Sequence, residues 1–105
     1  MEDEDMELEH NDESRDNTVF VGTKPFMNYV TGLVMQFTTK NADEVFLKAR
    51  GKFISKAVDI VEVTTKRFMK DQIKIHDIRV NSEEFTNKEG RLVRVSTIEF
   101  VLRKA

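Results

Sequence analysis

Basic side chains flank two glycines in this sequence, at places suited to phosphate binding. Lys24 follows "VGT", and Arg50 and Lys52 stand on either side of Gly51 in "KARGK". At each place an apolar run ends and a helical pattern begins. The amino end of a helix favours anions through its unsatisfied N–H groups and its dipole. A single lysine at a helix start is usually solvated surface, but two such junctions together favour a phosphate-binding role.

A third basic group occurs in "TNKEGRLVR", residues 86–94, which contains Lys88, Arg91 and Arg94. The turn at 87–91 joins two runs with strand character, and Gly90 can adopt the positive φ that such a turn needs. A projecting two-stranded arm is about the right size to enter a groove of a nucleic-acid duplex. Considered alone, the segment is better explained as an ordinary polar hairpin end.

The pattern of apolar residues predicts the elements that position these cations. We expect strands at 17–22, where a short apolar run indicates a buried strand, and at 44–50, 72–80 and 92–104, and helices at 23–37 and 52–69. In the first helix the apolar residues recur at helical spacing and predict a buried stripe of Phe26, Tyr29, Val30, Leu33, Val34 and Phe37. This order predicts an α/β (α+β) sandwich with βαβαββ topology, in which two helices cover one mixed four-stranded sheet and the last two strands form a long hairpin arm. With the first two strands parallel, both basic junctions fall on the same edge of the sheet.

Four local features refine this prediction. The alternation of "QIKIHDIRV" slips by one residue at His76–Asp77, which indicates a β-bulge, and a second phase change falls near Ser96–Thr97. Pro25 suits the first position of a helix. Gly32 weakens its helix by ~1 kcal/mol, which predicts close packing against another element.

Charge is divided unevenly along the 105 residues, although the net charge is only −2. Residues 1–16 hold nine acids and one arginine, which leaves sixteen basic and ten acidic residues in 17–105. We expect 1–16 to be an acidic disordered tail and 17–105 to be one domain. The tail is either a solubilising extension or a phosphate mimic that competes for the basic surface.

The composition also argues against several classes of protein. There is no cysteine, and no run approaches the ~20 apolar residues of a membrane span. The acidic N-terminus is not typical of a signal peptide, which begins with a positively charged region. We therefore expect a cytoplasmic protein with no membrane contact. His10 lies in the tail and His76 in a strand, so a catalytic constellation is hard to build and a metal site at His76 and Asp77 would lack further ligands. We therefore expect no enzyme and no cofactor.

Three segments, "VGTKPFMNYV", "KARGKFISKAVDIVE" and "RVSTIEFVLRK", together resemble the Alba family of archaeal chromatin proteins. The resemblance covers about residues 17–104 and implies the same βαβαββ fold. It implies a homodimer that binds double-stranded DNA with little sequence preference, coats or compacts it in the nucleoid, sometimes assembles further along it, and often binds RNA.

The resemblance also implies roles for particular residues. Nucleic-acid contacts are expected from the two junctions, the second helix and the arm, at Thr23, Lys24, Asn28, Arg50, Lys52, Lys56, Lys88, Arg91 and Arg94. Thr23 replaces the first of two lysines that many family members carry before the proline, so control by acetylation there is in doubt. Phe68 matches a phenylalanine that packs one dimer against the next, and an ordinary core position is the alternative.

Two other functions remain open from the sequence. One is RNA binding as a ribonucleoprotein subunit or RNA chaperone, because the same cations serve DNA and RNA phosphates. The other is a protein–protein adaptor that uses an exposed strand edge, which would leave the basic surface without a purpose.

Overall fold

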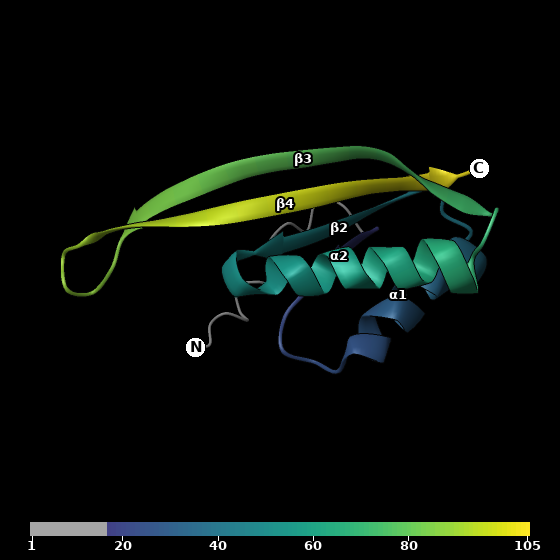
Figure 1. Ribbon diagram of the computed structural model, residues 1–105, viewed down its shortest axis with the longest axis horizontal. Coiled ribbons are helices and arrows are strands. Elements are labelled where there is room, and N and C mark those ends of the chain that lie inside the picture. The colour runs from purple at the N-terminus through teal and green to yellow at the C-terminus, as the bar shows by residue number, and fades with distance from the viewer. Residues whose placement is uncertain (1–16) are drawn as a thin grey trace.

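The computed structural model of this chain describes residues 17–105, which form a two-layer sandwich (Figure 1). In chain order the elements are β1 (Thr18–Phe20), α1 (Phe26–Thr38), β2 (Glu44–Arg50), η2 (Gly51–Phe53), α2 (Ile54–Val63), η3 (Thr64–Phe68), β3 (Ile73–Thr86) and β4 (Leu92–Lys104). This confirms the predicted βαβαββ fold. The predicted acidic tail lies outside the described residues.

The strands form one mixed sheet in the order β1-β2-β4-β3. β1 and β2 are parallel, and the other neighbouring pairs are antiparallel. β1 was predicted as a buried strand over 17–22, and this is wrong in part. The strand has only three residues, none of them fully buried, because it is an edge strand. The buried residue of this run is Val21, just after β1.

Both helices lie against one face of the sheet, and the core fills the space between the layers (Figure 1). The predicted stripe of α1 supplies Tyr29, Val30, Leu33 and Phe37 to this core. Each large apolar side chain that is fully buried stabilises the fold by roughly 1.5–3 kcal/mol relative to its exposure to water.

Two details of α1 differ from the prediction. Pro25 lies one position before the helix, with an extended ψ of 147°, rather than at its first position. A Cβ placed on Gly32 would meet no atom within 4 Å. The close packing predicted for this glycine is therefore absent within residues 17–105.

The predicted second helix is continuous, but it changes its winding along its length. A 3-10 turn, η2, leads into α2, and a π-helical turn, η3, follows it. The hydroxyls of Thr64 and Thr65 donate to the carbonyl oxygens of Ile60 and Val61, each at 2.8 Å, just where the winding widens. No helix of the described chain is long and apolar enough to cross a membrane.

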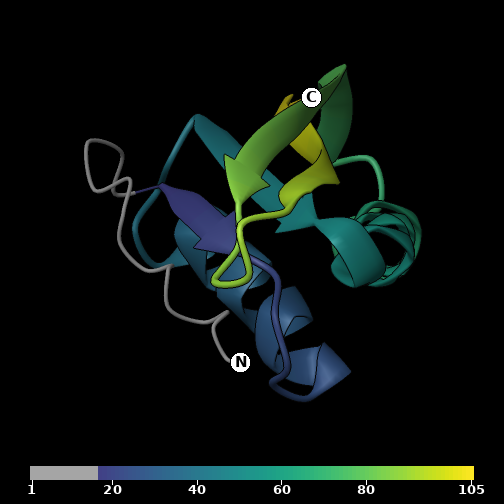
Figure 2. The same cartoon turned by 90° about the vertical axis from the view of Figure 1, so that its left-hand side faces the viewer.

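The β3–β4 hairpin forms an arm that extends past the end of α2 (Figure 1), and Figure 2 views the molecule from the side of its tip. Pairing runs from Ile73 with Lys104 to Thr86 with Leu92, and the register shifts between Ile75 and Asp77. This confirms the predicted bulge. β3 was predicted to end at residue 80, but it continues to Thr86 because the polar run after it pairs with β4.

The second predicted phase change, near Ser96–Thr97, involves no register shift. It marks the point where β4 leaves the arm and enters the body of the sheet. In the arm the residues of β4 alternate between exposed and half-buried. In the body Phe100, Val101 and Leu102 are buried in succession, so the alternation disappears.

Candidate nucleic-acid interface

The two strand–helix junctions lie at one edge of the sheet, as predicted. β1 and β2 run parallel and pair directly, so both end on the same side. The backbone N–H of Val21 donates to the Lys48 carbonyl oxygen at 2.9 Å and continues this alignment past β1. Lys24, Arg50 and Lys52 all have exposed side chains there. The structure thus places Lys24 at the same edge as Arg50 and Lys52, which are 26 and 28 positions later in the sequence.

The first junction is held by the side chains of Tyr29 and Lys56. The Tyr29 hydroxyl accepts hydrogen bonds from the backbone N–H groups of Gly22 at 2.9 Å and Lys24 at 3.1 Å. Lys56 Nζ donates to the carbonyl oxygens of the same two residues, each at 2.7 Å. The ammonium also lies 5.1 Å from the centre of the Tyr29 ring. These contacts fix the loop that carries Thr23 and Lys24.

These contacts change what the first junction can offer to a phosphate. The N–H groups of Gly22 and Lys24 are already bonded to a hydroxyl, so the exposed side chains of Thr23 and Lys24 are the groups that face solvent. Lys56 is partly buried, and burial lowers the pKa of its ammonium. Asn28 lies exposed in the first turn of α1, beside this loop.

The second junction depends on Gly51, whose φ of +52° is strained for residues with a Cβ. This turn takes the chain from the extended Arg50 into η2 and α2. Lys52 Nζ lies 5.5 Å from the centre of the Phe53 ring, within the range of a cation–π contact. The Arg50 guanidinium forms an ion pair with Glu83 of the arm, at 3.1 Å between Nη2 and Oε1.

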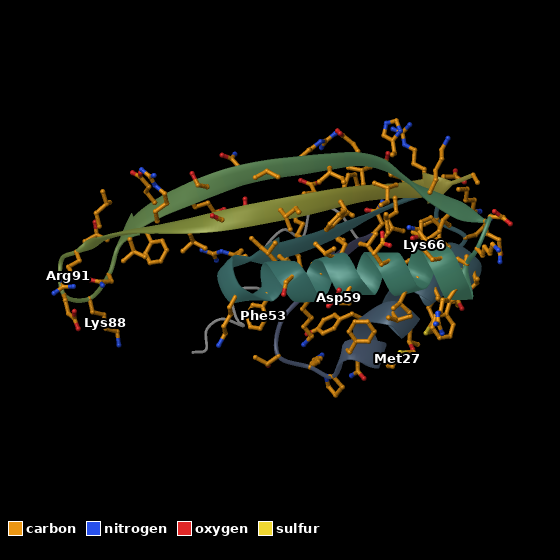
Figure 3. All side chains as sticks on the ribbon, in the orientation of Figure 1. Met27, Phe53, Asp59, Lys66, Lys88 and Arg91 are labelled. Carbon is orange, nitrogen blue, oxygen red and sulfur yellow. The ribbon has the colours of Figure 1, made fainter. Side chains whose placement is uncertain are left out.

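The tip of the arm presents Lys88 and Arg91, which point outward in Figure 3. Asn87 orders the turn, because its side-chain oxygen accepts from the N–H groups of Glu89 at 2.9 Å and Arg91 at 3.0 Å. Gly90 has a φ of +82°, which confirms the predicted positive φ at this position. The tip is therefore an ordered turn that carries two exposed cations.

Arg94, predicted as a third arm cation, is paired with an acid. Its Nη2 and Nε lie 2.9 and 3.3 Å from a carboxylate oxygen of Glu84, the residue opposite it in the ladder. Among residues 17–105, ion pairs to acids therefore engage Arg50 and Arg94, but not Lys24, Lys52, Lys88 or Arg91.

A groove of about 1070 Å³ connects the junctions with the base of the arm. Residues from both parts line it, among them Lys24, Arg50, Phe53, Glu83 and Phe85. Of the predicted cations, Lys24 and Arg50 line this groove, whereas Lys88, Arg91 and Arg94 of the arm do not.

Sequence reasoning missed two further cations of this groove, Lys48 and Arg79. Lys48 Nζ lies 5.9 Å from the centre of the Phe20 ring. Arg79 donates to Asp77 at 3.1 Å and lies 3.8 Å from Glu99. The hydrogen bond from Arg79 holds the pKa of the Asp77 carboxyl below its ordinary value. Alternation along β2 could have identified Lys48, since it shares a strand with Arg50.

Phe68 lies at the far end of the second helix from the arm, within η3, and its side chain is 52% exposed. The alternative that Phe68 is an ordinary core residue is therefore wrong. Its predicted role between dimers stays a prediction. No group of three or more potential metal ligands comes together among the described residues.

The fold and the site together define a small helix–sheet module with a basic edge and a projecting hairpin arm. The sequence model of the Alba family matches residues 17–82. The chain belongs to the Alba family.

Two relatives and one solved structure each match more than four fifths of this chain. "DNA/RNA-binding protein Alba" of Methanococcus maripaludis is 48% identical over 85% of this chain and 99% of its own length. The protein of the same name from Methanocella arvoryzae is 46% identical over 85% of this chain and 91% of its own. The solved structure of Alba from Thermoplasma volcanium superposes with a TM-score of 0.75 at 46% identity, covering 83% of this chain and 99% of that one.

Proposed function

We propose that this chain binds double-stranded DNA with low sequence specificity, coats or compacts it as a homodimer associated with the chromosome, and also binds RNA. The observation that carries the proposal is the shared edge of Lys24, Arg50 and Lys52 next to an arm that ends in Lys88 and Arg91. The names of the relatives, which specify DNA and RNA, support the same ligand class.

The binding mechanism is electrostatic. Lysine and arginine side chains that neutralise phosphates release condensed counterions, which gives affinity without reading bases. The acidic residues 1–16 oppose this attraction, because their carboxylates compete for the same cations. No metal or cofactor takes part in this mechanism.

Exposed apolar residues on the arm support the homodimer. Ile78 and Val80 pair with Phe100 and Ile98, so they continue the face of the sheet that the helices cover. They lie beyond that cover, with 50% and 73% of their surfaces exposed. Two adjacent apolar side chains left exposed on one face suit a contact with another chain, and a second copy is the partner that we propose.

The Lys24→Ala, Arg50→Ala double variant tests the proposed surface. We expect it to bind a DNA duplex at least about tenfold more weakly at low salt, and its log–log salt slope to be shallower by about two per chain. The measurement is fluorescence anisotropy with a labelled duplex over a range of salt concentrations.

The matched control is Lys40→Ala, Lys70→Ala. It removes the same charge from exposed positions that follow α1 and η3, at the opposite edge of the sheet. Both variants should keep the thermal stability of the parent chain. An affinity for DNA that falls equally in the two double variants would contradict the proposed surface.

A further inference from the structure

Two adjacent acids of the arm each hold an arginine of the candidate interface. Glu83 pairs with Arg50 at 3.1 Å, and Glu84 pairs with Arg94 at 2.9 Å. Successive side chains of a strand point to opposite faces. Glu83 and Glu84 therefore lie on opposite faces of the arm, and each balances the charge of an arginine of the same chain.

The pair between Arg50 and Glu83 spans three strands. In the ladder Arg50 is opposite Thr97 of β4, and Glu83 is opposite Val95, so the guanidinium reaches diagonally across β4 to the arm. Both side chains line the groove between the junctions and the arm. Both are also about half exposed, at 50% and 57%. A ligand that enters the groove thus meets this ion pair directly.

A carboxylate and a phosphate compete for the same groups of an arginine. Both present oxygen acceptors to the planar fork of N–H donors. An exposed ion pair contributes little stability, so a phosphate can displace Glu83. Once displaced, the carboxylate stays beside the phosphate as a like charge and continues to weaken binding.

We propose that Glu83 limits the affinity of this chain for nucleic acid by competing with phosphate for the Arg50 guanidinium. The inference rests on the proposed function and adds a residue that limits the affinity for nucleic acid. Glu83 is a positioning residue in this role, since it acts through Arg50. In the opposite role, Glu83 braces the arm in its binding orientation. Substitution of a brace weakens binding to nucleic acid, whereas substitution of a competitor strengthens it.

The test compares two neutral variants of the full chain, Glu83→Gln and Glu62→Gln. Glu62 is an exposed acid on α2 that pairs with Lys66 at 2.9 Å, so its substitution makes the same change in net charge away from the groove. The probe is a fluorescein-labelled DNA duplex of about 30 base pairs at low salt. We expect Glu83→Gln to bind about 3- to 10-fold more tightly than the parent, and Glu62→Gln less than about twofold.

Substitution of Arg50 shows whether Glu83 acts through it. In an Arg50→Gln background, Glu83→Gln should change the affinity by less than about twofold, because the contested group is gone. The inference is overturned by weaker binding of Glu83→Gln, by a gain no larger than that of Glu62→Gln, or by the full gain without Arg50. Binding by the parent chain in these cases leaves the proposed function standing. No binding by any variant removes both.

The fold of each variant is checked by thermal unfolding. Glu83 is exposed on an edge strand and Glu62 is exposed on α2, so we expect Glu83→Gln and Glu62→Gln to leave the unfolding midpoint unchanged. Glu83→Ser provides a second neutral variant with a side chain too short to brace Arg50. A gain in affinity from both Glu83→Gln and Glu83→Ser supports competition, and a loss from both supports the brace.

Discussion

Tyr29 and Lys56 together hold the loop of residues 22–24 by hydrogen bonds to its backbone N–H and carbonyl groups. The phenol oxygen satisfies two N–H groups, and the ammonium satisfies two carbonyl oxygens. Lys56 was predicted as a contact to nucleic acid, and that stays a prediction. The structure gives it another role, which is to position Lys24. This role could not be predicted from sequence, because the contacted carbonyls lie 32 and 34 positions away.

Removal of the phenol oxygen tests this loop. In Tyr29→Phe two backbone N–H groups lose their acceptor, which we expect to lower the free energy of unfolding by about 1–2 kcal/mol. Urea unfolding measures this loss. Thr38→Val is the control, because its hydroxyl donates to the Val34 carbonyl on the exposed side of α1, and we expect a change below about 0.5 kcal/mol. Equal stability of Tyr29→Phe and the parent would show that these hydrogen bonds do not hold the loop.

The elements differ in how far the sequence predicts them. The α1 stripe and the bulge near His76 follow from spacing alone, and both are confirmed. The outer half of β3, residues 81–86, has no apolar alternation, and its strand exists because β4 supplies ladder partners. The ion pair of Arg50 with Glu83 also depends on register. A slip of one residue would turn Glu83 to the other face of the arm, so the sequence without the ladder could not identify it.

Substitution of two glycines by alanine tests the backbone conformation at Gly51 and the open space beside α1 at Gly32. Gly51 has a positive φ, so Gly51→Ala should destabilise the fold by about 1 kcal/mol or more. Gly32 lies inside α1 with open space where a Cβ would point, so Gly32→Ala should stabilise the fold by about 0.5–1 kcal/mol. The free energy of unfolding in urea measures both. Destabilisation by Gly32→Ala would indicate that a second chain packs on this face of α1.

At the scale of the whole molecule, the body and the arm have different sources of stability. The body is held by a core between two layers. The arm is held by its ladder, since Ile73 alone is buried among the residues of β3. Figure 3 shows the arm carrying Lys88 and Arg91 well away from Lys66 at the other end of the molecule. The described chain is about 47 Å along its longest axis, so it can contact phosphates at several separate points.

The distribution of charge predicts how steeply the affinity for nucleic acid falls as salt rises. Residues 17–105 carry sixteen basic and ten acidic side chains, and four of the candidate cations have no acidic partner among them. Each phosphate neutralised on duplex DNA contributes about −0.9 to the slope of log affinity against log salt. A dimer that uses these cations on both chains must therefore lose affinity steeply as salt rises.

The most direct test is the affinity of the full chain for duplex DNA and duplex RNA over a salt series. We predict a linear log–log dependence with a slope steeper than about −3 for DNA, and a similar slope for RNA. Fluorescence anisotropy with labelled duplexes of mixed sequence provides the measurement. Weak binding to both duplexes that does not change with salt would contradict the account and would indicate a protein partner instead.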